Sequence, residues 1–149
     1  MAGKGLACFI TCMGVSALLL IIGNLGFNVR LENFAQLGMA MAASAICFVG
    51  IMMLISVMGK TEQAVSGAGW AILLVMSMIG GGMIPLMFMP SWLLIISHFS
   101  PVKWGIYALE GAIWRGFTVS EMLLPTGILF GVGISLFLIG SLILSRTDR

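Results

Sequence analysis

The sequence predicts an all-α membrane protein that crosses the bilayer about four times. Hydrophobic residues make up 60% of the 149 residues and charged residues only 8%, whereas soluble domains carry about a quarter charged residues. Four apolar runs are long enough, or nearly so, to cross a hydrocarbon core about 30 Å thick. None of these runs contains Asp, Glu, Lys, Arg or His. The bilayer would solvate the apolar exterior that this composition leaves.

The predicted spans cover residues 7–23, 35–57, 65–84 and 123–144, and together they form a single transmembrane domain over residues 1–149. The first run is the shortest, and with Lys4 as its basic flank it also resembles a signal peptide. Residues 23–27 match a signal-peptide cleavage site poorly, so we favour a span.

Polar residues indicate where the predicted helices begin. Asn33 and Gln36 have the spacing of an N-cap residue and its reciprocal partner at the start of the second span. Ser120 and Glu121 are predicted to start the last helix, with the carboxylate at its positive end. Residues 59–63 are predicted to form a tight polar loop between the second and third spans.

The distribution of basic residues favours cytoplasmic termini. With four spans both termini lie on one side of the membrane, and basic residues concentrate on the cytoplasmic side. The terminal side holds four of them and the other side three: Lys4, Lys60, Arg146 and Arg149 against Arg30, Lys103 and Arg115. The net charge is only +2 and the basic residues are dispersed, so we predict no nucleic-acid partner.

The connection between the third and fourth spans is the longest in the chain. Three consecutive glycines at 80–82 and then Pro85 break a helix. Pro90 and Pro101 precede two short predicted helices, residues 91–99 and 102–115, neither of which is long enough to span. Three of the four tryptophans lie in this connection, as in an interfacial belt: Trp92, Trp104 and Trp114.

The second short helix has an apolar stripe beside a mixed polar row. The stripe is Val102, Ile106, Leu109 and Ile113, and we expect it to face protein or lipid while Lys103 and Glu110 face outward. One interpretation is an amphipathic anchor. The other is a pair of re-entrant helices in the outer leaflet that close one end of a translocation path. The candidate gate residues are Pro85, Pro90, Trp92, Pro101, Trp104 and Glu110.

The stretches Met89-Pro90-x-Trp92, Ser100-Pro101 and Arg115-Gly116, which follow the glycine–proline break, resemble the permease subunits of type-2 ATP-binding-cassette (ABC) transporters. Smaller similarities lie along the rest of the chain: Gly3-Lys4, Gly26-Phe27 and Thr61-Glu62-Gln63-Ala64. Family members usually have six spans, and the four here look like the third to the sixth. The resemblance therefore implies a truncated permease, a fragment of one, or one piece of a split permease.

The resemblance also implies a function. It predicts a permease subunit in the plasma membrane, belonging to an exporter, with no enzymatic activity or cofactor of its own. ATP would be hydrolysed by a separate ABC ATPase subunit. The other expected partners are a second permease copy or the missing permease half, and membrane lipids. The loop that would face the ATPase contains Lys60, Thr61 and Glu62. Its two charged residues are either contacts with the ATPase or, the interpretation we favour, ordinary solvated loop charges.

The sequence lacks the residues that a nucleotide-binding, metal or redox site would need. Gly59-Lys60-Thr61 is similar to the end of a phosphate-binding loop, but Leu54 stands where the first glycine belongs. His98 is the only histidine, and Cys8, Cys12 and Cys47 lie in apolar runs, so we predict no metal or redox site. A copper site at Met83, Met87 and Met89 is the alternative to ordinary apolar packing, which we favour.

Two further alternatives stay open. Spans without ionisable groups do not fit a proton-coupled carrier, but they fit either an ATP-driven permease or a non-transporting membrane scaffold. Gly127 and Gly131 form a Gly-x-x-x-Gly pattern in the last span, which indicates either a close helix contact or chance in a glycine-rich segment.

Overall fold

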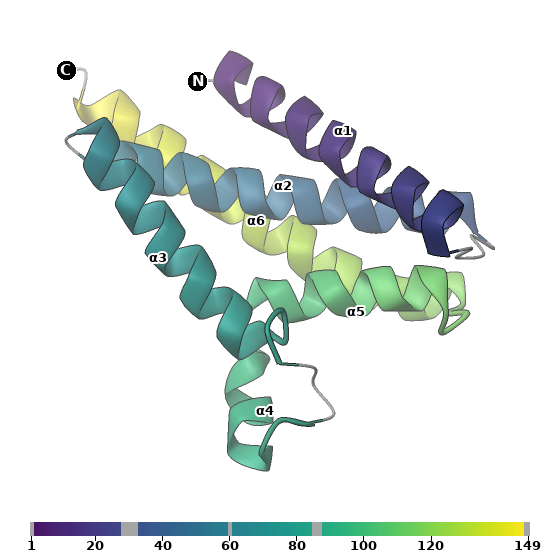
Figure 1. Ribbon diagram of the computed structural model, residues 1–149. Helices are drawn as coiled ribbons and strands as arrows, with labels where there is room; N and C mark the ends of the chain where they lie inside the picture. Colours follow the sequence, from purple (N-terminus) through teal and green to yellow (C-terminus); the bar gives the residue numbers. More distant parts are fainter. Residues whose placement is uncertain (1, 28–32, 60, 85–87, 148–149) are drawn as a thin grey trace.

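The computed structural model describes residues 2–27, 33–59, 61–84 and 88–147 (Figure 1). These residues form helices and no strands, which confirms the all-α prediction. In chain order the helices are α1 (Ala2–Phe27), α2 (Phe34–Met58), α3 (Glu62–Gly80), α4 (Ser91–Ser97), α5 (Pro101–Ile113) and α6 (Val119–Thr147).

Four of these helices are long and apolar enough to cross a membrane. The candidate spans are Gly5–Gly26, Phe34–Met58, Glu62–Gly80 and Val119–Ser145. The four predicted apolar segments are therefore confirmed as helices of spanning length. Most of their bounds lie outside the predicted ones, because helical hydrogen bonding continues into the polar residues that flank each apolar run.

The third span is displaced toward the N-terminus relative to the prediction. Thr61 caps α3, since its hydroxyl accepts a hydrogen bond of 3.2 Å from the backbone N–H of Ala64. At the other end Gly81 adopts the left-handed conformation, with φ of 93°, and its N–H donates to the carbonyl of Ser77. This glycine ends the helix, so the predicted end at residue 84 is wrong by four residues.

The core lies where α2 crosses α6 (Figure 1). Half of the spanning part of α2 is buried, more than in any other candidate span. Gly133 of α6 lies directly against the backbone of α2: a Cβ atom added to it would lie 2.7 Å from the carbonyl oxygen of Ile46 and 2.7 Å from Cα of Cys47. A Cβ atom added to Gly50 would collide in turn with the carbonyl of Gly133. Small residues let the two helix backbones touch.

The Gly-x-x-x-Gly pattern of the last span does not make this contact. Gly127 and Gly131 are exposed, and a Cβ atom added to either would meet nothing within 4 Å among the described residues. Gly133 and Gly140 lie seven residues apart on the face of α6 that packs on α2 instead. The close helix contact exists, but at other glycines.

Two predicted helix starts have different outcomes. Asn33 precedes α2 but its side chain makes no capping hydrogen bond, and Gln36 is not its partner. The Gln36 amide donates instead to the carbonyl of Phe117, at 2.8 Å. At α6 the prediction holds: Glu121 lies in the first turn, and its carboxylate accepts hydrogen bonds of 2.8 Å from the N–H and from the hydroxyl of Thr118.

Candidate functional site

The segment between α3 and α6 contains two separate short helices. Helix α5 ends at Ile113 and α6 begins at Val119, so the two do not form one continuous spanning helix. The start of α5 is fixed to the end of α3, because the Ser100 hydroxyl donates to the carbonyl of Met76 at 2.7 Å. Gly80 brings the backbones together there, since its added Cβ would lie 2.9 Å from the N atom of Lys103.

Helix α5 packs through its small residues. Its buried residues are Pro101, Gly105, Ala108, Gly111 and Ala112. The predicted stripe of larger residues, from Val102 to Ile113, lies beside this buried face and is half-buried. The stripe was expected to face protein or lipid, and Leu109 and Ile113 do pack against the core. The sequence pattern missed this buried face, because glycine and alanine add little to hydropathy. Lys103 and Glu110, which were expected to face outward, are half-buried like the stripe.

The predicted gate residues do not form one cluster. Pro90 precedes α4 and accepts hydrogen bonds at its carbonyl from the N–H groups of Leu93 and Leu94. Trp92 on α4 is 63% exposed. Pro101 and Trp104 lie in the first turn of α5, whereas Glu110 lies in its last turn. Pro85 lies outside the described residues.

The junction of α4 and α5 brings together three side chains. The Trp104 indole N–H donates to the carbonyl of His98 at 2.9 Å, and the two rings meet edge to face with centroids 6.0 Å apart. The ammonium of Lys103 lies 3.1 Å from Nε2 and 3.2 Å from Nδ1 of His98. Sequence spacing did not predict the pair, because His98 follows the end of α4 and Lys103 lies in the first turn of α5, so their contact depends on the turn between the two helices.

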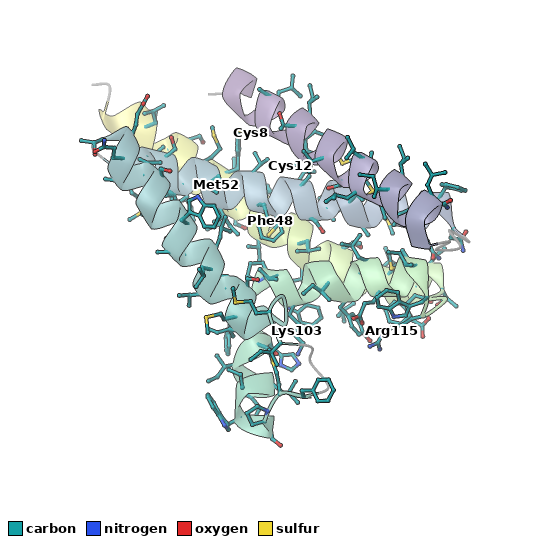
Figure 2. The ribbon with its side chains drawn as sticks, in the orientation of Figure 1. Cys8, Cys12, Phe48, Met52, Lys103 and Arg115 are labelled. Carbon is teal, nitrogen blue, oxygen red and sulfur yellow. The ribbon has the colours of Figure 1, made fainter. Side chains whose placement is uncertain are left out.

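A second polar cluster lies at the opposite end of α5. Figure 2 shows Arg115 there, and Lys103 where α4 meets α5. Arg115 forms an ion pair of 2.9 Å with Glu110, and its guanidinium lies 5.3 Å from the centre of the Tyr107 ring. Together with the bond from Gln36 to Phe117, these contacts hold the α5–α6 turn against the start of α2.

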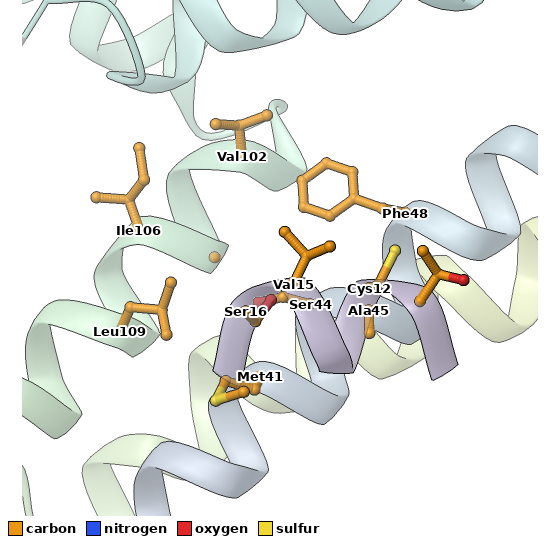
Figure 3. Close-up of a pocket in the computed structure, with 12 residues that line it drawn as sticks. Cys12, Val15, Ser16, Met41, Ser44, Ala45, Phe48, Val102, Ile106 and Leu109 are labelled. Carbon is orange, nitrogen blue, oxygen red and sulfur yellow. The ribbon is translucent and has the colours of Figure 1, made fainter. Parts of the chain in front are cut away.

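A groove of about 410 Å³ runs between α1, α2 and α5 (Figure 3). Its walls are mainly apolar, with Val15 of α1, Phe48 of α2 and Val102 of α5 among the lining residues. Its hydroxyl groups come from three lining residues: Thr11, Ser16 and Ser44. Sequence reasoning missed this groove, because its residues are uncharged and come from three helices far apart in the chain.

Ser44 is the one described residue with a buried side-chain polar atom that lacks a hydrogen-bond partner. Its Oγ lies 3.4 Å from the position of a Cβ atom added to Gly105, so the hydroxyl lies where α2 and α5 approach each other. A buried hydroxyl without a partner costs free energy. We therefore interpret Ser44 as a polar point in the wall of the groove rather than as a stabilising contact.

This interpretation predicts opposite effects for two serines. Ser44→Ala should leave the free energy of unfolding unchanged or raise it by up to about 1 kcal/mol, because an unsatisfied group is removed. Ser100→Ala should lower it by about 1 kcal/mol, because the bond to Met76 is lost. The measurement is the midpoint of unfolding by sodium dodecyl sulfate in mixed micelles. Equal destabilisation by both variants would contradict the assignment.

The loop before α3 is exposed. Thr61 and Glu62 are both exposed to solvent, and Glu62 stands in the first turn of α3. Lys60, the third residue predicted to face an ATPase, lies outside the described residues. This loop and the α4–α5 junction lie at opposite ends of α3 (Figure 1).

The fold and these sites define a multi-pass membrane protein: four candidate spans, with a pair of short helices before the last one. The family model described as ABC-2 type transporter matches residues 5–114, which include most of α1 and all of α2 to α5. The chain therefore belongs to the ABC-2 type transporter family, and the predicted resemblance is confirmed. It is a membrane-spanning permease component of an ABC transporter. Neither a curated protein nor a solved structure matches the chain.

Proposed function

We propose that this chain is the permease subunit of an ATP-driven exporter in the plasma membrane, working with a separate ATPase and a second permease unit. The observation that carries the proposal is the family match over residues 5–114. The sequence supports it, since the cores of the four spans contain no acidic, basic or histidine side chain. An ion-coupled carrier normally keeps such a group at membrane depth, so the energy for transport comes from another subunit.

We further propose that the groove between α1, α2 and α5 forms part of the translocation path. Its mainly apolar walls suit an apolar or amphipathic substrate, and its hydroxyls offer hydrogen bonds. Helix α5 forms one wall and is held at its two ends by the bonds of Ser100 and Gln36. In this proposal α4 and α5 re-enter the membrane, and a shift of α5 between these two attachments widens or closes the groove.

The ATPase would bind at the other end of α3, at the loop containing Lys60, Thr61 and Glu62. The exposure of Thr61 and Glu62 supports this assignment. The helix ends favour it too, because α3 begins at Glu62 and ends at Gly80 beside α5. A gate at one end of the span and the energy source at the other would place the two functions on opposite sides of the membrane.

The test is a comparison of ATP turnover with and without the partner. The purified chain alone should neither bind nor hydrolyse ATP, because it lacks a phosphate-binding loop. The tagged chain should co-purify an ATPase, and the complex in lipid vesicles should hydrolyse ATP faster than that ATPase alone. Saturable ATP binding by the isolated chain would contradict the proposal, and so would failure to recover any ATPase.

Two matched variants test the proposed binding end. Glu62→Gln removes the carboxylate of the ATPase-facing loop. Glu121→Gln removes a carboxylate from the first turn of α6, which in this proposal lies on the opposite side of the membrane. The amide of the second variant can still accept the hydrogen bonds from Thr118. We expect Glu62→Gln to reduce the recovered ATPase and Glu121→Gln to leave it unchanged.

A further inference from the structure

A lysine–histidine pair without a carboxylate partner lies at the junction of α4 and α5. The Lys103 ammonium contacts the ring nitrogens of His98 and, within the part of the chain that the structure describes, no acidic side chain. The other basic side chain described there, Arg115, has Glu110 as its partner. Partial burial lowers the pKa of Lys103 from its ordinary value. The ammonium is thus partly withdrawn from water without a compensating negative charge.

The hydrogen bonds of His98 leave the ammonium with spare donors. Nδ1 of His98 lies 2.8 Å from the carbonyl of Leu94, and the Lys103 ammonium contacts both ring nitrogens, at 3.2 Å and 3.1 Å. The His98 ring therefore takes up one donor of the ammonium. An ammonium has three donors, and the other two are available to an anionic oxygen.

The pair lies at the level where α3 ends. At 1.5 Å per residue the 19 residues of α3 extend about 28 Å, close to the thickness of the hydrocarbon core. Lys103 is adjacent to Gly80, the last residue of α3. A span that starts at one membrane surface therefore places Lys103 near the other surface, at the depth of the lipid headgroups.

Exposed apolar side chains lie on α4 and directly after His98. Phe99, the neighbour of His98, is 88% exposed, and Trp92 and Ile95 on α4 are 63% and 67% exposed. Aromatic side chains at such a level insert among the lipid chains below the headgroups. A cation flanked by these side chains fits a ligand that has both an anionic group and an apolar tail.

We propose that Lys103, positioned by His98, binds the phosphate of an anionic phospholipid headgroup. The Lys103 ammonium donates to phosphate oxygens, and its contact with the His98 ring holds it at the α4–α5 junction. Trp92, Ile95 and Phe99 contact the acyl chains. The inference is independent of the proposed transport activity, since it requires only that the chain is embedded in the membrane.

The experiment uses Trp104 as the reporter, because its indole bonds the carbonyl of His98. The full chain carrying Trp70→Phe, Trp92→Phe and Trp114→Phe is reconstituted into phosphatidylcholine vesicles with a minor fraction of phosphatidylglycerol. Either lipid is brominated near the headgroup end of its acyl chains, which quenches nearby tryptophan. We compare samples in which the brominated lipid makes up the same fraction of the vesicle. The quenching of Trp104 should then correspond to an affinity for phosphatidylglycerol about fivefold higher than that for phosphatidylcholine, as expected for one basic residue near an anionic surface.

Lys103→Gln should abolish this preference, whereas the matched Arg115→Gln variant, which also loses one positive charge on the same short segment, should keep it. Equal quenching by the two lipids, or equal losses in both variants, would overturn the proposal. A last arm replaces sodium chloride by sodium phosphate at the same ionic strength. Persistence of the preference supports a lipid ligand, and its loss would show that the site takes free phosphate instead.

Discussion

Replacement of Gly133 by valine is expected to lower the free energy of unfolding by about 3 kcal/mol, the upper end of the usual cost of overpacking a core. The added side chain would enter the space of the α2 backbone, since even a Cβ atom lies 2.7 Å from the carbonyl oxygen of Ile46. A backbone group cannot rotate aside as a side chain can. The two helices must therefore separate, and their contact is the centre of the core.

The matched control is Gly131→Val on the same helix. It makes the same change in side-chain size and backbone freedom, but Gly131 is exposed and a Cβ atom there meets nothing within 4 Å. We expect its free energy of unfolding, measured in mixed micelles, to remain within about 0.5 kcal/mol of that of the unchanged chain, as for surface substitutions. Equal destabilisation by both variants would mean that the valine itself, and not the contact with α2, weakens the fold.

The spans were predictable because hydropathy is a sum over many residues. About 20 apolar residues in a row have few alternatives to a membrane helix, and one exceptional residue changes the summed hydropathy of such a segment little. Helix ends depend on single residues instead. Thr61 and Gly81 moved the third span toward the N-terminus through one capping hydrogen bond and one left-handed glycine, and neither effect contributes to hydropathy.

Contacts between helices were less predictable, because each depends on a partner that the local sequence does not contain. Gly127 and Gly131 fit the Gly-x-x-x-Gly pattern but do not face α2, whereas Gly133 does. Gln36 has the spacing of a capping residue, yet the carbonyl of Phe117 comes within reach through the fold and takes its hydrogen bond. Only the packing of α2 on α5 and α6 selects between such choices.

In the candidate site, too, the helices were predictable from the local sequence and the contacts between segments were not. Prolines and tryptophans predicted two short helices before the last span, and the structure has α4 and α5 there. The groove was not predictable because it combines residues from three helices, and the Lys103–His98 pair was not predictable because it depends on the turn between α4 and α5. A lone lysine or histidine in a sequence does not indicate whether an acidic partner lies nearby in the fold.

Single cysteines at residues 61 and 118 should differ completely in their labelling by a membrane-impermeant thiol reagent applied from outside the cell. With cytoplasmic termini, the start of α3 faces the cytoplasm and the start of α6 faces outward. Thr118→Cys should therefore be labelled and Thr61→Cys should be labelled only after the membrane is permeabilised. The background must lack the native thiols of Cys8, Cys12 and Cys47.

The two positions are well matched for this comparison. Both threonines are exposed, and both hydrogen-bond at the start of a long helix: Thr61 with the N–H of Ala64, and Thr118 with the carboxylate of Glu121. Thr61→Cys loses an N-cap acceptor, which costs about 1 kcal/mol, and Thr118→Cys loses one exposed hydrogen bond, which costs a similar amount, about 1 kcal/mol, so unequal unfolding does not explain a difference in labelling. Labelling of Thr61→Cys alone would show that the predicted orientation is wrong. Lys103 and Arg115 would then lie on the cytoplasmic side. The ATPase-facing loop would have to be sought beside α5 instead.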